Sequence, residues 1–250
     1  MVLQAQEGVL TTSSARFLVA TAVPAERDAV AGAFPGPAAE VPLPAATLHR
    51  TGGFDLLAVG VGPALAAAST ASALTAAALR GAPYDLVVSA GIAGGFIPDA
   101  PVGSLVVADD IVAGDLGAET TDGFLPVTDL GFGTVSHRPP TSLVRELAAA
   151  SGALTGTVLT VSTVTGSARR AAELRARHPR ALAEAMEGFG VAEAAAAHGT
   201  PVVEIRAVSN PVGPRDRAAW RIGDALGALT EGFGKLATAL ESWTQHDRTQ

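Results

Sequence analysis

Three residues that could handle protons or hydrogen bonds stand at the ends of apolar segments. Glu26 follows a first apolar run, residues 17–22, and Glu187 opens an Ala-rich segment with a helical pattern. Asn210 comes directly after a second apolar run, residues 202–209. A carboxylate can activate water or hold hydroxyl groups, and an amide can both donate and accept. Together these side chains could hold a sugar and a purine base.

Each of the three also has an ordinary structural interpretation. Carboxylates such as Glu26 and Glu187 are favourable in the first turn of a helix, where the helix dipole stabilises negative charge. Asn210 precedes Pro211, a pairing that is typical of turns. A functional interpretation is favoured by their joint placement at strand and helix ends, because ligands in α/β sheets bind beyond the carboxyl ends of strands. The turns at 21–26, 60–62, 89–95 and 209–213 lie at such ends.

The other motifs give weaker evidence of a function. Gly60-Val61-Gly62 begins like a dinucleotide fingerprint, but Leu65 stands at the third glycine position, which disfavours that function. The segment Ala90-Gly91-Ile92-Ala93-Gly94-Gly95 predicts a tight turn that could present backbone N–H groups to an anion or hydroxyl. Ser89 lacks the flanking glycines of a nucleophile elbow.

Composition excludes several chemistries. The 250 residues carry a net charge of −7 without any Lys/Arg run, which disfavours nucleic acid as a partner. Cysteine is absent, and no two of the five histidines are spaced by three or four residues. We therefore expect no disulfide, thiolate nucleophile, metal or other cofactor. The N-terminal segment does not resemble a signal peptide and long apolar runs are interrupted, so we expect a cytoplasmic protein that makes no membrane contact.

The pattern of elements predicts a single α/β domain. Six nearly continuous apolar runs are typical of strands covered on both faces, and they alternate with helical patterns. The predicted strands are 17–22, 55–60, 85–91, 104–108, 157–162 and 202–209, and the predicted helices are 25–33, 63–80, 141–151, 168–177, 187–198 and 218–243. Residues 114–140 are rich in turn-forming types and are expected to form long loops. The expected organisation is a flexible extension (1–16), one domain (17–243) and a C-terminal tail (244–250).

With these motifs the chain resembles the purine nucleoside phosphorylase and nucleosidase superfamily, over almost its whole length. The resemblance rests on Glu26, the segment 88–95, the pair Met186-Glu187 and the pair Ser209-Asn210. It implies a three-layer sandwich around a central twisted mixed sheet, in a homo-oligomer of two or more subunits. Segments 185–190 and 209–216 are similar to the branch of this family that releases hypoxanthine from a 5′-substituted nucleoside in menaquinone synthesis.

The resemblance also implies roles for individual residues. Glu26 would be the general base that activates water, Glu187 would bind the ribose hydroxyls, and Asn210 would read the purine. The remaining implied contacts to the substrate are Ile92, Ala93, Gly94, Val164, Thr165, Met186 and Ser209. Ile92 departs from the methylthioadenosine nucleosidases, which have a polar residue at that position.

Asn210 is the more informative departure, because adenine-cleaving relatives have an aspartate there. A neutral amide can donate to O6 of a 6-oxopurine, which favours hypoxanthine as the released base. Phosphorylases have arginines where this chain has Glu26 and Ser89, so hydrolysis is favoured over phosphorolysis. The alternatives are a methylthioadenosine/S-adenosylhomocysteine nucleosidase, a purine nucleoside phosphorylase, and a nucleoside-binding protein that has lost its chemistry.

Overall fold

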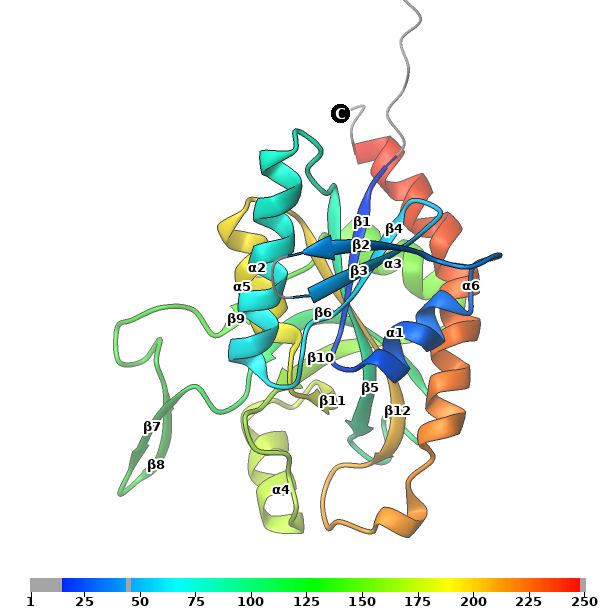
Figure 1. Ribbon diagram of the computed structural model, residues 1–250. Helices are drawn as coiled ribbons and strands as arrows, with labels where there is room; N and C mark the ends of the chain where they lie inside the picture. Colours follow the sequence, from blue (N-terminus) through cyan, green and yellow to red (C-terminus); the bar gives the residue numbers. More distant parts are fainter. Residues whose placement is uncertain (1–14, 44–45, 248–250) are drawn as a thin grey trace, which may run out of the picture.

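The computed structural model describes residues 15–43 and 46–247, with the side chains of 245–247 left aside. A mixed sheet of ten strands forms the centre of the molecule, in the order β11-β10-β6-β12-β5-β1-β4-β3-β2 with β9 paired to β6 (Figure 1). Its strands are β1 (Phe17–Thr21), β2 (Ala39–Leu43), β3 (Ala46–Thr51), β4 (Phe54–Ala58), β5 (Leu86–Gly95), β6 (Leu105–Ala113), β9 (Ser136–His137), β10 (Leu154–Thr160), β11 (Ala181–Ala185) and β12 (Val202–Pro211).

Helices cover both faces of this sheet. The helices are α1 (Pro24–Ala31), α2 (Pro63–Leu79), α3 (Thr141–Ser151), α4 (Ala168–Arg177), α5 (Gly188–Ala197) and α6 (Ile222–Asp247), with a 3₁₀ turn η1 (Arg217–Ala219) before α6. One core packs α2 and α5 against the sheet, and a second core packs α3 and α6 against the other face (Figure 1). Small side chains such as Ala66, Ala73 and Ala192 let α2 and α5 lie close together. The predicted three-layer sandwich with a mixed sheet is confirmed.

The central strand β5 corrects one prediction. Residues 90–95 were expected to form a turn, but they continue β5 as far as Gly95. Strand β12 pairs with this segment along its length, and β11 pairs with Gly94 and Gly95 from the other side. Backbone groups of this segment therefore bond to neighbouring strands or to side chains, as the Ile92 N–H does to Glu26.

Strand β12 also runs further than predicted. It includes Asn210 and Pro211, with a bulge at Ser209 between Val208 and Asn210. A bulge re-aims the side chains that follow it, because one extra residue enters one strand of the pair. Asn210 is thus held within the sheet, in register with Gly94 of β5, and not in a free turn.

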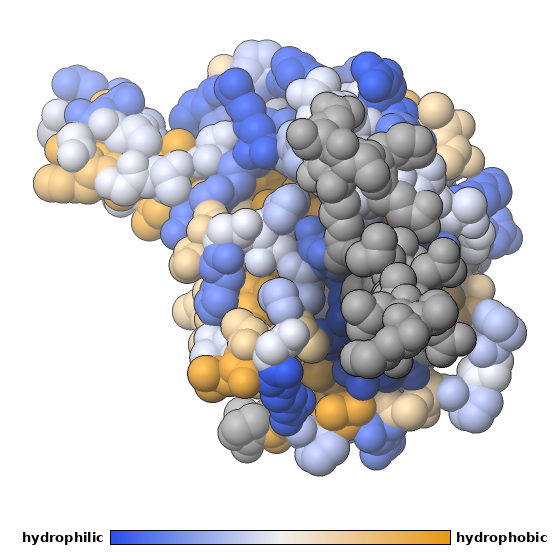
Figure 2. Space-filling view, turned by 90° about the horizontal axis from the view of Figure 1, so that it is seen from above, coloured by the Kyte–Doolittle hydropathy of each residue, from blue (hydrophilic) through white to orange (hydrophobic). Residues whose placement is uncertain are grey.

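The region expected to be long loops contains a hairpin. Strands β7 (Gly117–Thr120) and β8 (Gly123–Pro126) form a separate two-stranded sheet. The hairpin stands away from the main body of the molecule (Figures 1 and 2). Strands β2, β3 and β11 were also not predicted. Strand β2, at the edge of the sheet, and its neighbour β3 are partly exposed and of mixed composition.

Both ends of the described part of the chain carry defined structure. Residues 1–14 of the expected extension lie outside the described residues, whereas Arg16 forms a 3.0 Å ion pair with Asp55. Helix α6 begins at Ile222, not 218, and continues to Asp247, so most of the expected tail is helical. Residues 248–250 lie outside the described part. Within that part, no helix combines the length and apolar character needed to cross a membrane.

Candidate active site

Glu26 lies in a buried niche between β1 and β5. One carboxylate oxygen accepts hydrogen bonds from the backbone N–H groups of Ala22 (2.9 Å) and Val23 (3.3 Å), and the other accepts from Ile92 N–H (2.8 Å). The side chain belongs to the first turn of α1, which starts at Pro24 directly after the strand. These contacts fix the carboxylate at the carboxyl end of β1. The residue is only 4% exposed.

Glu187 is held from several elements at once. It lies at the N-cap of α5, and its carboxylate accepts from Gly62 N–H at the start of α2 (3.3 Å) and from Met186 N–H (3.3 Å). The second carboxylate oxygen also accepts from the Arg206 guanidinium at 3.2 Å. Glu187 therefore does not cap its own helix. It faces the centre of the sheet.

Arg206 joins these two carboxylates into one cluster. Its guanidinium bonds Glu204 at 2.8 Å, Glu187 at 3.2 Å, the Ile92 carbonyl at 3.3 Å and the Ser89 hydroxyl at 3.4 Å. It is 1% exposed and lies on β12, the strand beside β5. Its guanidinium also reaches the wall of the niche that holds Glu26, because a Cβ on Gly91 would lie 2.7 Å from both side chains.

The cluster holds three carboxylates against one guanidinium, and all four groups are buried. Burial raises the pKa of Glu26, and the nearby Arg206 charge and the Ile92 N–H only partly offset this. Burial also raises the pKa of Glu204, although Arg206 acts in the opposite direction. Burial of the Arg206 guanidinium lowers its pKa, but the carboxylates of Glu204, Glu187 and Glu26 outweigh this and raise it. Arg206 is therefore a permanent cation within an acidic cluster.

A second group of predicted residues lines a small cavity of about 80 Å³ at the ends of β5, β11 and β12. Asn210, Val164 and Thr165 line it together with Gly94, Glu184 and Trp220. The Ser209 hydroxyl lies 2.9 Å from Asn210 Oδ1 and 3.2 Å from the Ala93 carbonyl. Asn210 Nδ2 donates to the Pro211 carbonyl at 3.0 Å, which leaves one amide proton for a ligand.

The structure brings the predicted residues together in two adjoining groups. Glu26 and Glu187 share the cluster around Arg206, and Asn210, Val164, Thr165 and Gly94 share the cavity. Ile92 and Ala93 lie on β5 between the two groups, where they bond Glu26 and Ser209 through their backbone. Met186 follows the end of β11, next to Glu187.

Sequence reasoning missed Arg206, Glu204 and Glu184. A signal for the first two was present, because Glu204 and Arg206 are two positions apart in the otherwise apolar strand Val202–Pro211 and so share one face of it. Charged residues at alternate positions of a buried strand require partners. Glu184 gave a weaker signal, since β11 itself was not predicted.

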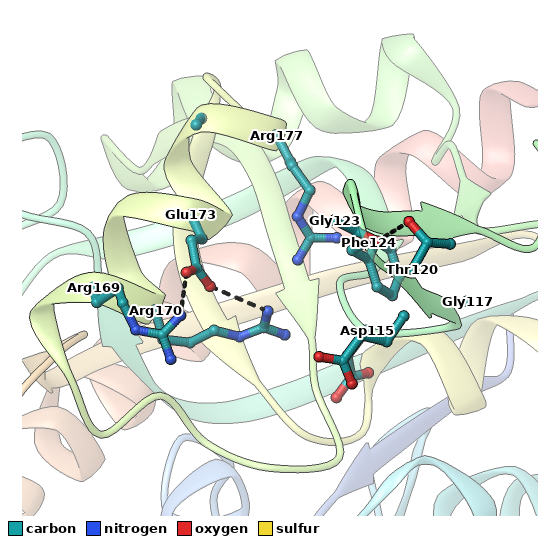
Figure 3. Close-up of a pocket in the computed structure, with 11 residues that line it drawn as sticks. Asp115, Gly117, Thr120, Gly123, Phe124, Arg169, Arg170, Glu173 and Arg177 are labelled. Carbon is teal, nitrogen blue, oxygen red and sulfur yellow. Dashed lines mark hydrogen bonds and ion pairs between the residues drawn. The ribbon is translucent and has the colours of Figure 1, made fainter.

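A larger cavity of about 770 Å³ lies between α4 and the β7–β8 hairpin (Figure 3). Arg169 and Arg170 both face Glu173 there, and Arg177 packs over the ring of Phe124 (Figure 3). None of the predicted site residues lines this cavity. The chemistry is better assigned to the cluster around Arg206 and the adjoining small cavity, because charged groups are buried and mutually fixed there.

Known proteins are similar to this chain in sequence and in fold. Residues 44–240 match the model of the phosphorylase superfamily. A futalosine hydrolase of Streptomyces coelicolor is 76% identical over 92% of this chain and 99% of its own, and one of Acidothermus cellulolyticus is 46% identical over 90% and 92%. The structure of a futalosine hydrolase of Helicobacter pylori superposes with a TM-score of 0.77 at 18% identity, covering 90% of this chain and 98% of that one.

These matches confirm the resemblance inferred from the motifs around Glu26, Glu187 and Asn210. The range matched by the family model includes Glu187 and Asn210, whereas Glu26 lies before it. The chain belongs to the phosphorylase superfamily and, within it, to the futalosine hydrolases.

Proposed function

We propose that this protein hydrolyses the N-glycosidic bond of futalosine, releasing hypoxanthine and dehypoxanthinyl futalosine for menaquinone synthesis. The observation that carries the proposal is the 76% identity, over nearly the full length of both chains, with the Streptomyces coelicolor futalosine hydrolase. The buried carboxylates and the amide at neighbouring strand ends are the groups that such a hydrolysis requires.

Glu26 acts as the general base in this proposal. Cleavage of an N-glycosidic bond develops positive charge on the sugar, so a water oriented by one carboxylate suffices as the nucleophile. Three backbone N–H groups hold the Glu26 carboxylate in place, and the raised pKa makes it a stronger base than an exposed glutamate. Arg206 is a positioning residue, because its guanidinium bonds Glu187 and lies beside the niche that holds Glu26.

Glu187 binds the ribose and Met186 packs against it. The Glu187 carboxylate has free lone pairs in addition to those that accept from Gly62, Met186 and Arg206, and these can accept from sugar hydroxyls. Its negative charge also stabilises the positive sugar in the transition state. Ile92, Ala93 and Gly94 of β5 form the strip between the sugar and the base.

Asn210 reads the purine. Its remaining amide proton donates to the 6-oxo group and stabilises negative charge on the departing base. Val164 and Thr165 close the same cavity from the loop after β10, and Ser209 fixes the orientation of the Asn210 amide.

Water, and not phosphate, is the second substrate. Phosphate binding needs free cationic donors, whereas Arg206 is already bonded to Glu187 and Glu204. Three carboxylates against one guanidinium leave the cluster negative when all are ionised, which repels phosphate.

One assay tests the proposal. Purified protein is incubated with futalosine, inosine and methylthioadenosine, with and without phosphate, and the free base is followed by chromatography. We expect release of hypoxanthine from futalosine at a rate that phosphate does not change. Preferred release of adenine would indicate a methylthioadenosine nucleosidase, dependence on phosphate would indicate a phosphorylase, and binding without release would indicate a nucleoside-binding protein.

A homo-oligomer of two or more subunits is part of the proposal. It is supported by apolar side chains exposed on and beside the β7–β8 hairpin, among them Leu116, Leu125 and Phe132, the last 67% exposed. Light scattering of the purified protein tests it, and a monomeric mass at micromolar concentration would contradict it.

A further inference from the structure

One buried carboxylate near the proposed base site has no role in the mechanism above. Glu184 is the penultimate residue of β11. Its side chain is buried, with the residue 5% exposed, and it lines the same small cavity as Asn210. A buried carboxylate at such a place needs an explanation, because burial raises its pKa and its charge must be satisfied.

The sheet register places Glu184 and Asn210 on either side of a glycine. Gly94 of β5 pairs with Glu184 of β11 and with Asn210 of β12. Paired residues of neighbouring strands point to the same face, and two strand spacings separate their backbones by about 10 Å. A Cβ at Gly94 would lie 3.0 Å from Val212 Cγ2 and 3.4 Å from Asn210 Nδ2. A side chain at position 94 would therefore crowd the Asn210 amide, and the glycine keeps the space beside that amide clear.

The Glu184 carboxylate is oriented before any ligand arrives. Thr165 donates to it through the backbone N–H at 2.7 Å and through the hydroxyl at 2.5 Å, one bond to each oxygen. An ionised carboxylate has about four lone-pair sites. Two of them remain, at the wall of a cavity whose size suits the edge of a ring and not a whole nucleoside.

The two purine classes present opposite patterns to such a pair of side chains. A 6-oxopurine shows an acceptor at O6 beside a donor at N1–H, whereas a 6-aminopurine shows a donor at the amine beside an acceptor at N1. A carboxylate accepts the N1–H of the former and meets the N1 lone pair of the latter with no proton between them. Unpaired buried groups discriminate strongly between otherwise similar ligands.

We propose that Glu184 is a specificity-determining residue that accepts the N1–H of the 6-oxopurine while Asn210 donates to O6. The inference rests on the proposed function, because it assigns the base subsite of that reaction. It adds a reason for the exclusion of adenine nucleosides that Asn210 alone does not supply, since Asn210 contacts only the substituent at C6 and Glu184 recognises the group at N1.

The test compares Glu184→Gln with the wild type on futalosine and on its 6-amino analogue. Glutamine keeps the size of the side chain but offers an N–H₂ group that suits the N1 acceptor of a 6-aminopurine. We expect the ratio of kcat/KM values, 6-oxo over 6-amino, to fall about 5- to 150-fold, which corresponds to the cost of leaving one buried polar group unpaired. The matched control is Glu173→Gln on the exposed face of α4, which should leave the ratio unchanged.

A purely structural role for Glu184 would lower both kcat/KM values by the same factor and leave their ratio intact, and that result would overturn the inference. Thr165→Val is the second variant, which tests the proposal even where Glu184→Gln fails to fold. It removes one hydrogen bond to the Glu184 carboxylate, so it should lower the ratio by a smaller factor than Glu184→Gln. Calorimetric titration with free hypoxanthine and free adenine separates the two proposals. If the wild type binds hypoxanthine preferentially and releases no base, while Glu184→Gln loses this preference, the catalytic proposal fails and the base assignment stands. If it releases hypoxanthine and Glu184→Gln leaves the preference for hypoxanthine over adenine unchanged, the base assignment fails alone.

Discussion

Gly91 offers a way to disturb the catalytic cluster without removing any of its chemical groups. It lies on β5, where a single Cβ would meet both the Glu26 carboxylate and the Arg206 guanidinium. A Cβ at this position would approach Glu26 Oε1 and Arg206 Nη1 to 2.7 Å each, where ordinary contacts begin at 3.4 Å. The substitution Gly91→Ala therefore inserts one methyl group between the proposed base and the cation that positions it.

The expected size of the effect follows from these distances. Each side chain must move by about 0.7 Å to restore an ordinary contact, or β5 must shift between β1 and β12. A misplacement of about 1 Å in a catalytic group costs roughly 100-fold in rate. We expect kcat to fall about 10- to 100-fold with a smaller change in KM, and stability to fall by about 1–3 kcal/mol through overpacking.

Steady-state release of hypoxanthine from futalosine gives kcat and KM, and urea unfolding gives stability. Gly227→Ala is the matched control, because nothing lies within 4 Å of a Cβ at that position in α6. It should keep full activity and gain about 0.5–1 kcal/mol of stability from the higher helix propensity of alanine. A folded Gly91→Ala protein with wild-type kcat would refute the placement of the base and the guanidinium against this residue.

The remaining predictions concern the charged groups of the cluster. Glu26→Gln should lower kcat by about 10²–10⁴-fold with KM changed little, because it removes the base and keeps the shape; near wild-type turnover in the hypoxanthine assay would contradict the base assignment. Arg206→Met should cost about 3–5 kcal/mol in urea unfolding at pH 7, because it leaves Glu187 and Glu204 buried without their cation; a loss below about 1 kcal/mol would show that the carboxylates find other compensation. The raised pKa of Glu26 places the acid limb of kcat/KM above pH 4.5, since the base acts ionised and activity is lost as pH falls through that pKa; a limb below pH 4.5 would contradict it. The raised pKa values of Glu26, Glu184 and Glu204 mean that the folded state binds protons more tightly than the unfolded state, so their contribution to the free energy of unfolding should fall as pH rises from 4.5. Unfolding of Glu204→Gln across this range checks the sign, because the variant should lose part of that dependence.

The sequence by itself determined the layered architecture and the identity of most proposed site residues. Continuous apolar runs require strands covered on both faces, and the helical patterns between them supply the covering layers. Glu26, Glu187 and Asn210 were identified because each stands where an apolar run or a helix begins or ends. Such positions are readable from local pattern, since a change of period marks the end of an element.

Tertiary structure decided which groups meet and in what state of charge. Strand β11 pairs with its neighbour in the chain, β10, and also with the distant strand β5. Only the pairing with β5 sets Glu184 opposite Gly94. Likewise, Arg206 stands in a buried strand whose local pattern does not reveal that Glu26 and Glu187 approach it from two other elements. Pairing between distant strands depends on packing across the whole sheet and not on local propensity. The raised pKa of Glu26 has the same origin, because burial is a property of the assembled fold.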